Sequence, residues 1–117
     1  MQQLKDGNSS TLKNAYLGAL TMKSAQFEKA SKDKIETFKS GKSLLETSIS
    51  KEPKNGEFRF IRLATQEKSP KILHYNTNLE EDKKIVLETY RSLELTVRIA
   101  IKKYAEESDV ISSNELK

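Results

Sequence analysis

The sequence predicts an all-α protein of four or five antiparallel helices with no sheet. Apolar residues recur at spacings of three and four along most of the chain, which is the helical period, whereas no segment keeps the strict alternation of a strand. Short polar or proline-containing breaks separate these segments, and short connections favour antiparallel packing of successive helices. The length of 117 residues suits one domain. We place this single helical domain at residues 11–107, between a flexible N-terminus, 1–10, and a flexible C-terminal tail, 108–117.

The first two helices are expected at residues 12–30 and 33–51. The apolar stripe of the first comprises Leu12, Tyr16, Ala19, Leu20, Phe27 and Ala30, and that of the second comprises Ile35, Phe38, Leu45 and Ile49, widened by Leu44. Gly18 and Gly41 lie inside these helices. A glycine there costs about 1 kcal/mol relative to alanine, so we expect each one to allow close approach of a neighbouring helix. Pro53 ends the second helix, because the residue before a proline is biased away from the helical region.

The segment EPKNGEFRFIRL, residues 52–63, could begin a strand or a helix. Phe58 and Phe60 fit the alternation of a strand that follows an Asn-Gly turn, but Ile61 breaks this phase. No other segment of the chain offers a partner strand. We therefore expect a Pro-x-Asn turn followed by a third helix over residues 57–68.

The last third of the chain contains an apolar connector and a long periodic segment. Residues 70–77 are too apolar to be free in solvent, so we expect them to pack on the core. Asn78 is expected to cap the next helix, with Glu81 returning the bond. The N-terminus of a helix carries a partial positive charge, which explains the three acids in the first turn of this one: Glu80, Glu81 and Asp82. Residues 79–107 form either one helix or two helices broken near residues 92–94.

The usual arrangements of acid, base, nucleophile and metal ligands are missing from the sequence, although Glu80, Glu81 and Asp82 could in principle act as general acids or bases. The chain has no cysteine and one histidine, His74, so we expect neither thiolate chemistry nor a His/Cys metal site. Gly41-Lys42-Ser43 is similar to the end of a phosphate-binding loop, but Glu36 stands where that motif needs its first glycine. We therefore expect no enzyme activity, no catalytic residue, no metal and no cofactor, and interpret His74 as structural or half-exposed.

The net charge of +4 is concentrated in the first half of the chain. Residues 1–56 hold ten lysines and six acids, whereas residues 57–117 hold eleven basic and eleven acidic residues. A basic excess indicates an anionic partner only weakly. It leaves one alternative function open, that of a nucleic-acid-associated accessory protein, although the chain has no basic run and no aromatic stacking motif. No apolar run reaches the length of a membrane span, so we expect a soluble protein, cytoplasmic, or periplasmic if an export signal was trimmed.

Arg59, Arg62 and Gln66 share one face of the third helix, because they are spaced by three and four residues. Two interpretations of the arginines are open. They pair with Glu57, Glu67 or acids of the helix that begins at residue 79, or they recognise the carboxylates of an acidic peptide. We expect the partner-binding surface in a groove between the first and third helices, where these side chains point outward: Tyr16, Lys23, Arg59, Arg62 and Gln66.

Two patterns within residues 12–68 resemble a known helical repeat. Phe38-x-x-Gly41-x-x-x-Leu45-x-x-x-Ile49-x-x-x-Pro53-x-Asn55 is similar to the second helix and exit turn of a tetratricopeptide repeat, and Ala15-Tyr16-Leu17-Gly18-Ala19 is similar to its first helix. The chain also resembles small uncharacterised bacterial helical proteins that carry an Asn-x-Glu-Phe-Arg-Phe-x-Arg-Leu segment and a later Glu-Glu-Asp-Lys-Lys helix start. These resemblances imply right-handed helical hairpins and a non-catalytic role in protein–protein interaction or scaffolding.

Overall fold

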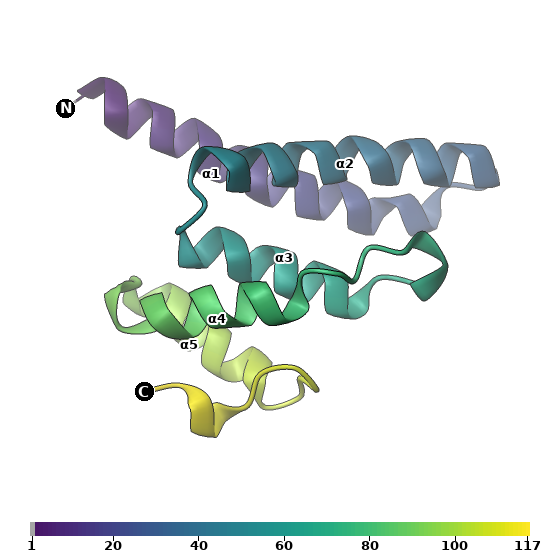
Figure 1. Cartoon of the computed structure of the whole chain (residues 1–117). Coiled ribbons are helices and arrows are strands. Elements are labelled where there is room, and N and C mark those ends of the chain that lie inside the picture. The colour runs from purple at the N-terminus through teal and green to yellow at the C-terminus, as the bar shows by residue number, and fades with distance from the viewer. Residues whose placement is uncertain (1) are drawn as a thin grey trace. The chain divides into compact units, whose positions relative to one another are not determined.

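The computed structural model describes residues 2–117, with side chains described from residue 10 onward. This part of the chain is all-α, as predicted, and contains no strand (Figure 1). It divides into two compact units, Met1–Pro53 and Lys54–Lys117. The expectation of a single domain over residues 11–107 stays a prediction.

Unit 1 is a hairpin of two long helices. Helix α1 spans Gln2–Ser24 and continues into a short 3-10 helix, η1, at Ala25–Phe27. Helix α2, Ser31–Lys51, returns beside it in the antiparallel direction (Figure 1). The expected flexible N-terminus, 1–10, lies mostly outside the residues whose side chains are described.

Gly18 and Gly41 allow the backbones of α1 and α2 to touch. A Cβ atom on Gly18 would lie 2.6 Å from the carbonyl oxygen of Gly41 and 2.8 Å from the amide nitrogen of Leu45. A Cβ atom on Gly41 would lie 2.5 Å from the carbonyl oxygen of Gly18 and 2.7 Å from the amide nitrogen of Met22. These separations are shorter than real Cβ contacts, so the close approach expected at both glycines is confirmed.

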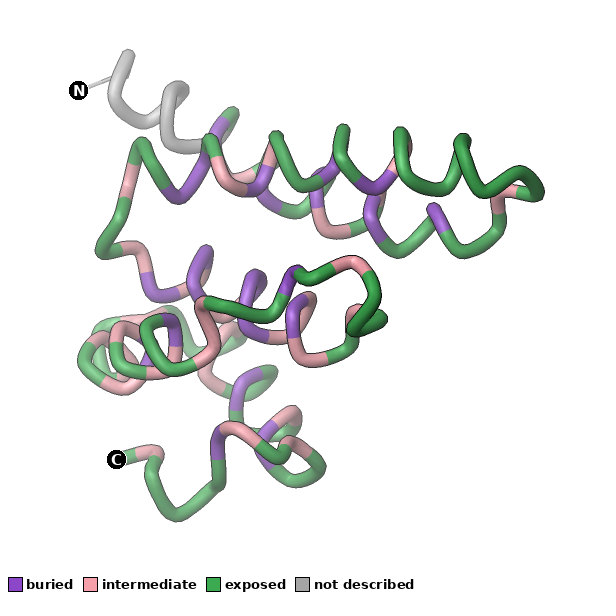
Figure 2. Tube along the Cα trace, turned by 45° about the vertical axis from the view of Figure 1, so that its right-hand side comes forward, coloured by how far each residue is buried: buried purple, intermediate pink, exposed green. Residues whose placement is uncertain are grey.

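The face of α1 that packs on α2 is built mainly from small residues. Its buried positions recur at spacings of four and three and continue into η1 at Ala25: Thr11, Ala15, Gly18, Met22 and Ala25. The apolar stripe named from the sequence is therefore not the buried face: Leu20 and Phe27 are exposed, and so is Tyr16, which was also expected to point outward. The cause is the close approach of the helices, since large side chains at this contact would hold the two backbones apart. Buried positions accordingly recur at intervals between exposed ones along α1 and along α2 from Phe38 onward (Figure 2).

Helix α2 follows its predicted stripe more closely. Phe38, Leu45 and Ile49 are buried as expected, whereas Ile35 is exposed. Ser48 is also buried, although no apolar pattern selects it. Its hydroxyl donates to the carbonyl oxygen of Thr11 at 3.1 Å and lies 3.0 Å from that of Leu44.

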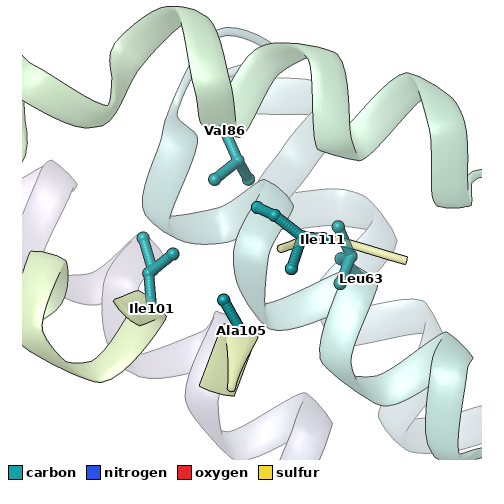
Figure 3. Close-up of a cluster of buried hydrophobic side chains, with 5 residues drawn as sticks. All are labelled: Leu63, Val86, Ile101, Ala105 and Ile111. Atoms are coloured by element: carbon teal, nitrogen blue, oxygen red, sulfur yellow. The ribbon is translucent and has the colours of Figure 1, made fainter. Parts of the chain in front are cut away.

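Unit 2 contains three α-helices around one apolar cluster. Helices α3, Gly56–Lys68, and α4, Leu79–Thr89, run antiparallel, and α5 spans Leu95–Ala105 (Figure 1). Three 3-10 helices complete the unit: η2 at Lys71–Leu73, η3 at Tyr90–Ser92 and η4 at Ser113–Glu115. The cluster joins residues of all three α-helices and of the C-terminal segment (Figure 3): Leu63, Val86, Ile101, Ala105 and Ile111.

The start of α3 confirms the helical interpretation of EPKNGEFRFIRL. Asn55 is the N-cap residue, and its side-chain oxygen accepts a hydrogen bond from the amide of Phe58 at 3.0 Å. Gly56 does not adopt a positive φ. Its small size is required instead, because a Cβ atom there would collide with the side chain of Thr89 and lie 3.3 Å from Leu93.

The long periodic segment forms two helices rather than one. Helix α4 ends at Thr89, and the chain becomes extended at Leu93 (ψ 155°) and Glu94 (ψ 151°) before α5 begins. The break thus lies where the second alternative placed it. It turns α5 so that Ile101 and Ala105 reach the core.

The C-terminal segment, residues 108–117, is not the flexible tail that was expected. Ile111 is only 1% exposed and belongs to the core of unit 2. Ser112 and Glu115 form a capping box around η4, and Lys83 Nζ lies 2.8 Å from the Glu115 carboxylate. The segment lacks helical periodicity, so the sequence pattern gave no sign of this packing.

Candidate functional site

The arginine face that was predicted to bind a partner is buried. Arg59, Arg62 and Gln66 are all buried within α3, so the expectation that they point outward was wrong. The groove expected between the first and third helices would join the two separately described units, and it stays a prediction. Tyr16 and Lys23, the other two residues of that predicted surface, are exposed on α1.

Both arginines bind acids at the start of α4. Arg62 donates two hydrogen bonds to Asp82, from Nε to Oδ2 and from Nη2 to Oδ1, each 2.8 Å long. Arg59 Nη1 lies 3.0 Å from Asp82 Oδ1 and 2.8 Å from Glu81 Oε2. Asp82 is 0% exposed. The interpretation that the arginines pair with acids of the following helix is therefore confirmed.

This cluster holds α4 on α3. Removing charges from water is costly, and a buried pair is tolerated only when its hydrogen bonds are well formed. That condition is met, because no buried polar side-chain atom in the described region lacks a hydrogen-bond partner. The hydrogen bond from Arg59, followed by that from Asn78, lowers the pKa of Glu81 from its ordinary 4.5. The guanidinium groups of Arg59 and Arg62 are thus bound by acids of unit 2 itself.

Asp82 is the residue that the sequence interpretation misread. It was assigned to helix capping with Glu80 and Glu81, yet it is the buried acceptor for both arginines. One signal in the sequence could have identified it. Leu79, Asp82 and Val86 are spaced by three and four residues, so this aspartate lies on the apolar stripe of its helix.

The predicted capping box at the start of α4 was also wrong. Asn78 occupies the N-cap position but makes no side-chain capping bond. Its side-chain oxygen accepts from Gln66 Nε2 at 2.9 Å, and its backbone amide donates to Gln66 Oε1 at 2.9 Å. The glutamine side chain thus replaces the capping bond with a link between α3 and α4.

Glu67 ties the C-terminal segment to α3. Its carboxylate accepts hydrogen bonds from the Tyr104 hydroxyl at 2.6 Å, the Ser108 hydroxyl at 2.7 Å and the Asp109 amide at 2.7 Å. Burial raises the pKa of Glu67, but these hydrogen bonds outweigh it and hold the pKa below 4.5. Burial, followed by the bond to Glu67, raises the pKa of the Tyr104 phenol. These three hydrogen bonds hold the C-terminal segment against α3, which indicates a structural role. We call Glu67 together with Tyr104, Ser108 and Asp109 the latch.

His74 lies exposed in the connector between α3 and α4, with a left-handed backbone (φ 55°). Over the described residues, no group of three or more histidines and acids is placed to hold a metal ion. No helix in this part of the chain has the length and apolar character that crossing a bilayer requires. The expected absence of enzyme activity, metal and cofactor stays a prediction.

The side of α1 that faces away from α2 carries large apolar residues and lysines. We call it the outer face, and its members are spaced by three and four residues: Lys13, Tyr16, Leu17, Leu20, Lys23 and Phe27, the last in η1. Leu17, Leu20 and Phe27 are 51%, 64% and 78% exposed. Within the described part of the chain, neither lysine of this face takes part in an ion pair. The sequence analysis placed Tyr16 and Lys23 on an outward surface, but it named Leu20 and Phe27 only as members of an apolar stripe.

Comparison with known proteins gives no relative for this chain: no family model, no curated protein and no solved structure matches it. The tetratricopeptide resemblance therefore stays a prediction.

Proposed function

We propose that the protein is a non-catalytic helical module that binds another protein through the outer face of α1. The observation that carries this proposal is the exposure of Leu17 and Leu20 on the side of α1 opposite to the α2 contact, followed by the exposed Phe27 in η1. Scattered apolar residues are normal on protein surfaces, but a contiguous row at helical spacing is typical of an interaction site. A partner helix laid along such a row would bury apolar area on both sides.

This proposal keeps part of the predicted binding surface and discards the rest. Tyr16 and Lys23 belong to the outer face and remain candidate contact residues. Arg59, Arg62 and Gln66 are held inside unit 2, so a partner could reach them only after local unfolding. The candidate site therefore lies on one helix of the hairpin.

The nucleic-acid alternative has less support than protein binding. Non-specific nucleic-acid binding rests mainly on lysine and arginine contacts to phosphates. The outer face has two lysines among three well-exposed apolar side chains, which a phosphate backbone would leave without apolar partners. A protein partner satisfies both kinds of residue.

The experiment that tests this proposal compares partner capture by matched variants of the full chain. Leu20→Ser/Phe27→Ser removes the two most exposed apolar members of the outer face, whereas Ile72→Ser/Leu95→Ser removes exposed apolar residues elsewhere. We expect both variants to keep the helicity of the wild type. A polypeptide captured by the wild type should be lost with the first variant and retained with the second. Equal capture by both variants would refute the proposal.

A further inference from the structure

We infer that the partner bound by the outer face is an acidic amphipathic helix, an inference that rests on the proposed function. Along the outer face the residues follow one another as Lys13, Tyr16 with Leu17, Leu20, Lys23 and Phe27. The two lysines therefore lie on the apolar row rather than beside it. A complementary helix would carry carboxylates at two points of its own apolar row.

The charge of α1 supports an acidic partner. No aspartate or glutamate occurs between Asp6 and Glu28, so the helix offers its lysines no acid of its own over this stretch. Every charged residue on the outer face is basic. Opposite charges across an interface steer association and fix its register.

The geometry sets the spacing that the partner must have. Lys13 and Lys23 are ten residues apart, which corresponds to about 15 Å along a helix that rises 1.5 Å per residue. A partner helix that meets both lysines therefore needs two acids about ten residues apart, with apolar residues between them at helical spacing. Leu20 lies between the two lysines and would contact those apolar residues.

Two other occupants fit the outer face less well. In an antiparallel pair of two copies of this chain, Lys13 of one copy would lie near Lys23 of the other, and like charges there disfavour association. A helix that lies on a membrane keeps its basic residues on the polar face. Here Lys23 lies between Leu20 and Phe27 on the apolar row, where insertion into lipid would carry it away from water.

The inference can be tested with two synthetic helical peptides and the full chain. The acidic probe has leucines at spacings of three and four and two glutamates about ten residues apart on the same face, and the control probe has lysines in place of those glutamates. We expect the wild-type chain to bind the acidic probe at least about tenfold more tightly than the control probe at low salt.

Charge reversal on the chain should reverse this preference. Lys13→Glu/Lys23→Glu is expected to bind the control probe more tightly than the acidic probe. Lys32→Glu/Lys39→Glu makes the same change in net charge at exposed positions of α2 and should keep the wild-type preference.

Several results would overturn the acidic-helix inference. They are equal affinity of the wild-type chain for both probes, no binding of the acidic probe, or an unchanged preference after reversal of Lys13 and Lys23. Binding to phosphatidylserine vesicles that is lost in Lys13→Glu/Lys23→Glu would assign the face to a membrane. A dimer of the chain that dissociates in Leu20→Ser would assign it to a second copy. The capture experiment with Leu20→Ser/Phe27→Ser does not depend on the partner's charge, so it separates failure of this inference from failure of the proposed function.

Discussion

Asp82→Ala should destabilise the protein far more than any other single removal of an acid from α4. The substitution deletes the acceptor of two hydrogen bonds from Arg62 and one from Arg59. It leaves both guanidinium groups buried without this carboxylate. Breaking a buried charge pair from one side costs about 3–5 kcal/mol. Domains of this size have a free energy of unfolding of about 5–15 kcal/mol, so the loss would be a large part of the total.

Glu81→Ala is the matched control for this prediction. Glu81 also binds Arg59, at 2.8 Å, but its side chain is 56% exposed. Exposed ion pairs contribute about 0.2–1 kcal/mol, because water screens the charges and the side chains lose freedom when they pair. Both substitutions remove one negative charge from the first turn of α4, so the difference between them reports the burial of Asp82 together with its two bonds to Arg62.

The two variants can be compared by urea unfolding followed by circular dichroism. The reasoning predicts a much lower midpoint for Asp82→Ala, with an unchanged dependence on urea concentration, and a small shift for Glu81→Ala. Equal midpoints for the two variants would refute it, because they would show that the buried carboxylate holds α4 no better than the exposed one.

Three further predictions concern the close contacts and the latch. Gly18→Ala should lower the free energy of unfolding by about 1–3 kcal/mol despite its better helix propensity, because its Cβ would meet backbone atoms; Ser40→Ala, at an exposed position of α2, should change it little. Gly56→Ala should be destabilising through its clash with Thr89, and adding Thr89→Ala should restore part of the loss in a double-mutant cycle. Glu67→Gln should be destabilising at neutral pH. Because the folded pKa of Glu67 is lowered, its contribution is present above about pH 4.5 and lost as the pH falls through the folded pKa, so the two urea midpoints should converge in acid.

The helices could be predicted from sequence because local signals agree with one another. Pro53 ends α2, and Asn55 caps α3 through a hydrogen bond to Phe58. The phase break at Ile61 excludes a strand. Each of these signals acts within a few residues, so it does not depend on how the helices pack.

The candidate site could not be predicted in the same way. The burial of Arg59 and Arg62 depends on where Asp82 lies after α3 and α4 have packed, and Asp82 is 23 and 20 residues further along the chain. The packing of Ile111 in the core likewise depends on the latch at Glu67, which no periodicity in residues 108–117 indicates.

Helix α1 shows why periodicity alone cannot tell the buried face from the exposed one. Residues 11, 15, 18 and 22 and residues 13, 16, 20 and 23 follow the same period on opposite sides of the helix. The larger side chains would ordinarily select the buried side, but Gly18 faces Gly41 and fixes the opposite choice. Burying a side chain such as leucine or phenylalanine is worth about 1.5–3 kcal/mol. Most of this stabilisation is absent at Leu20 in α1 and at Phe27 in η1, and a partner that covers the outer face would supply it.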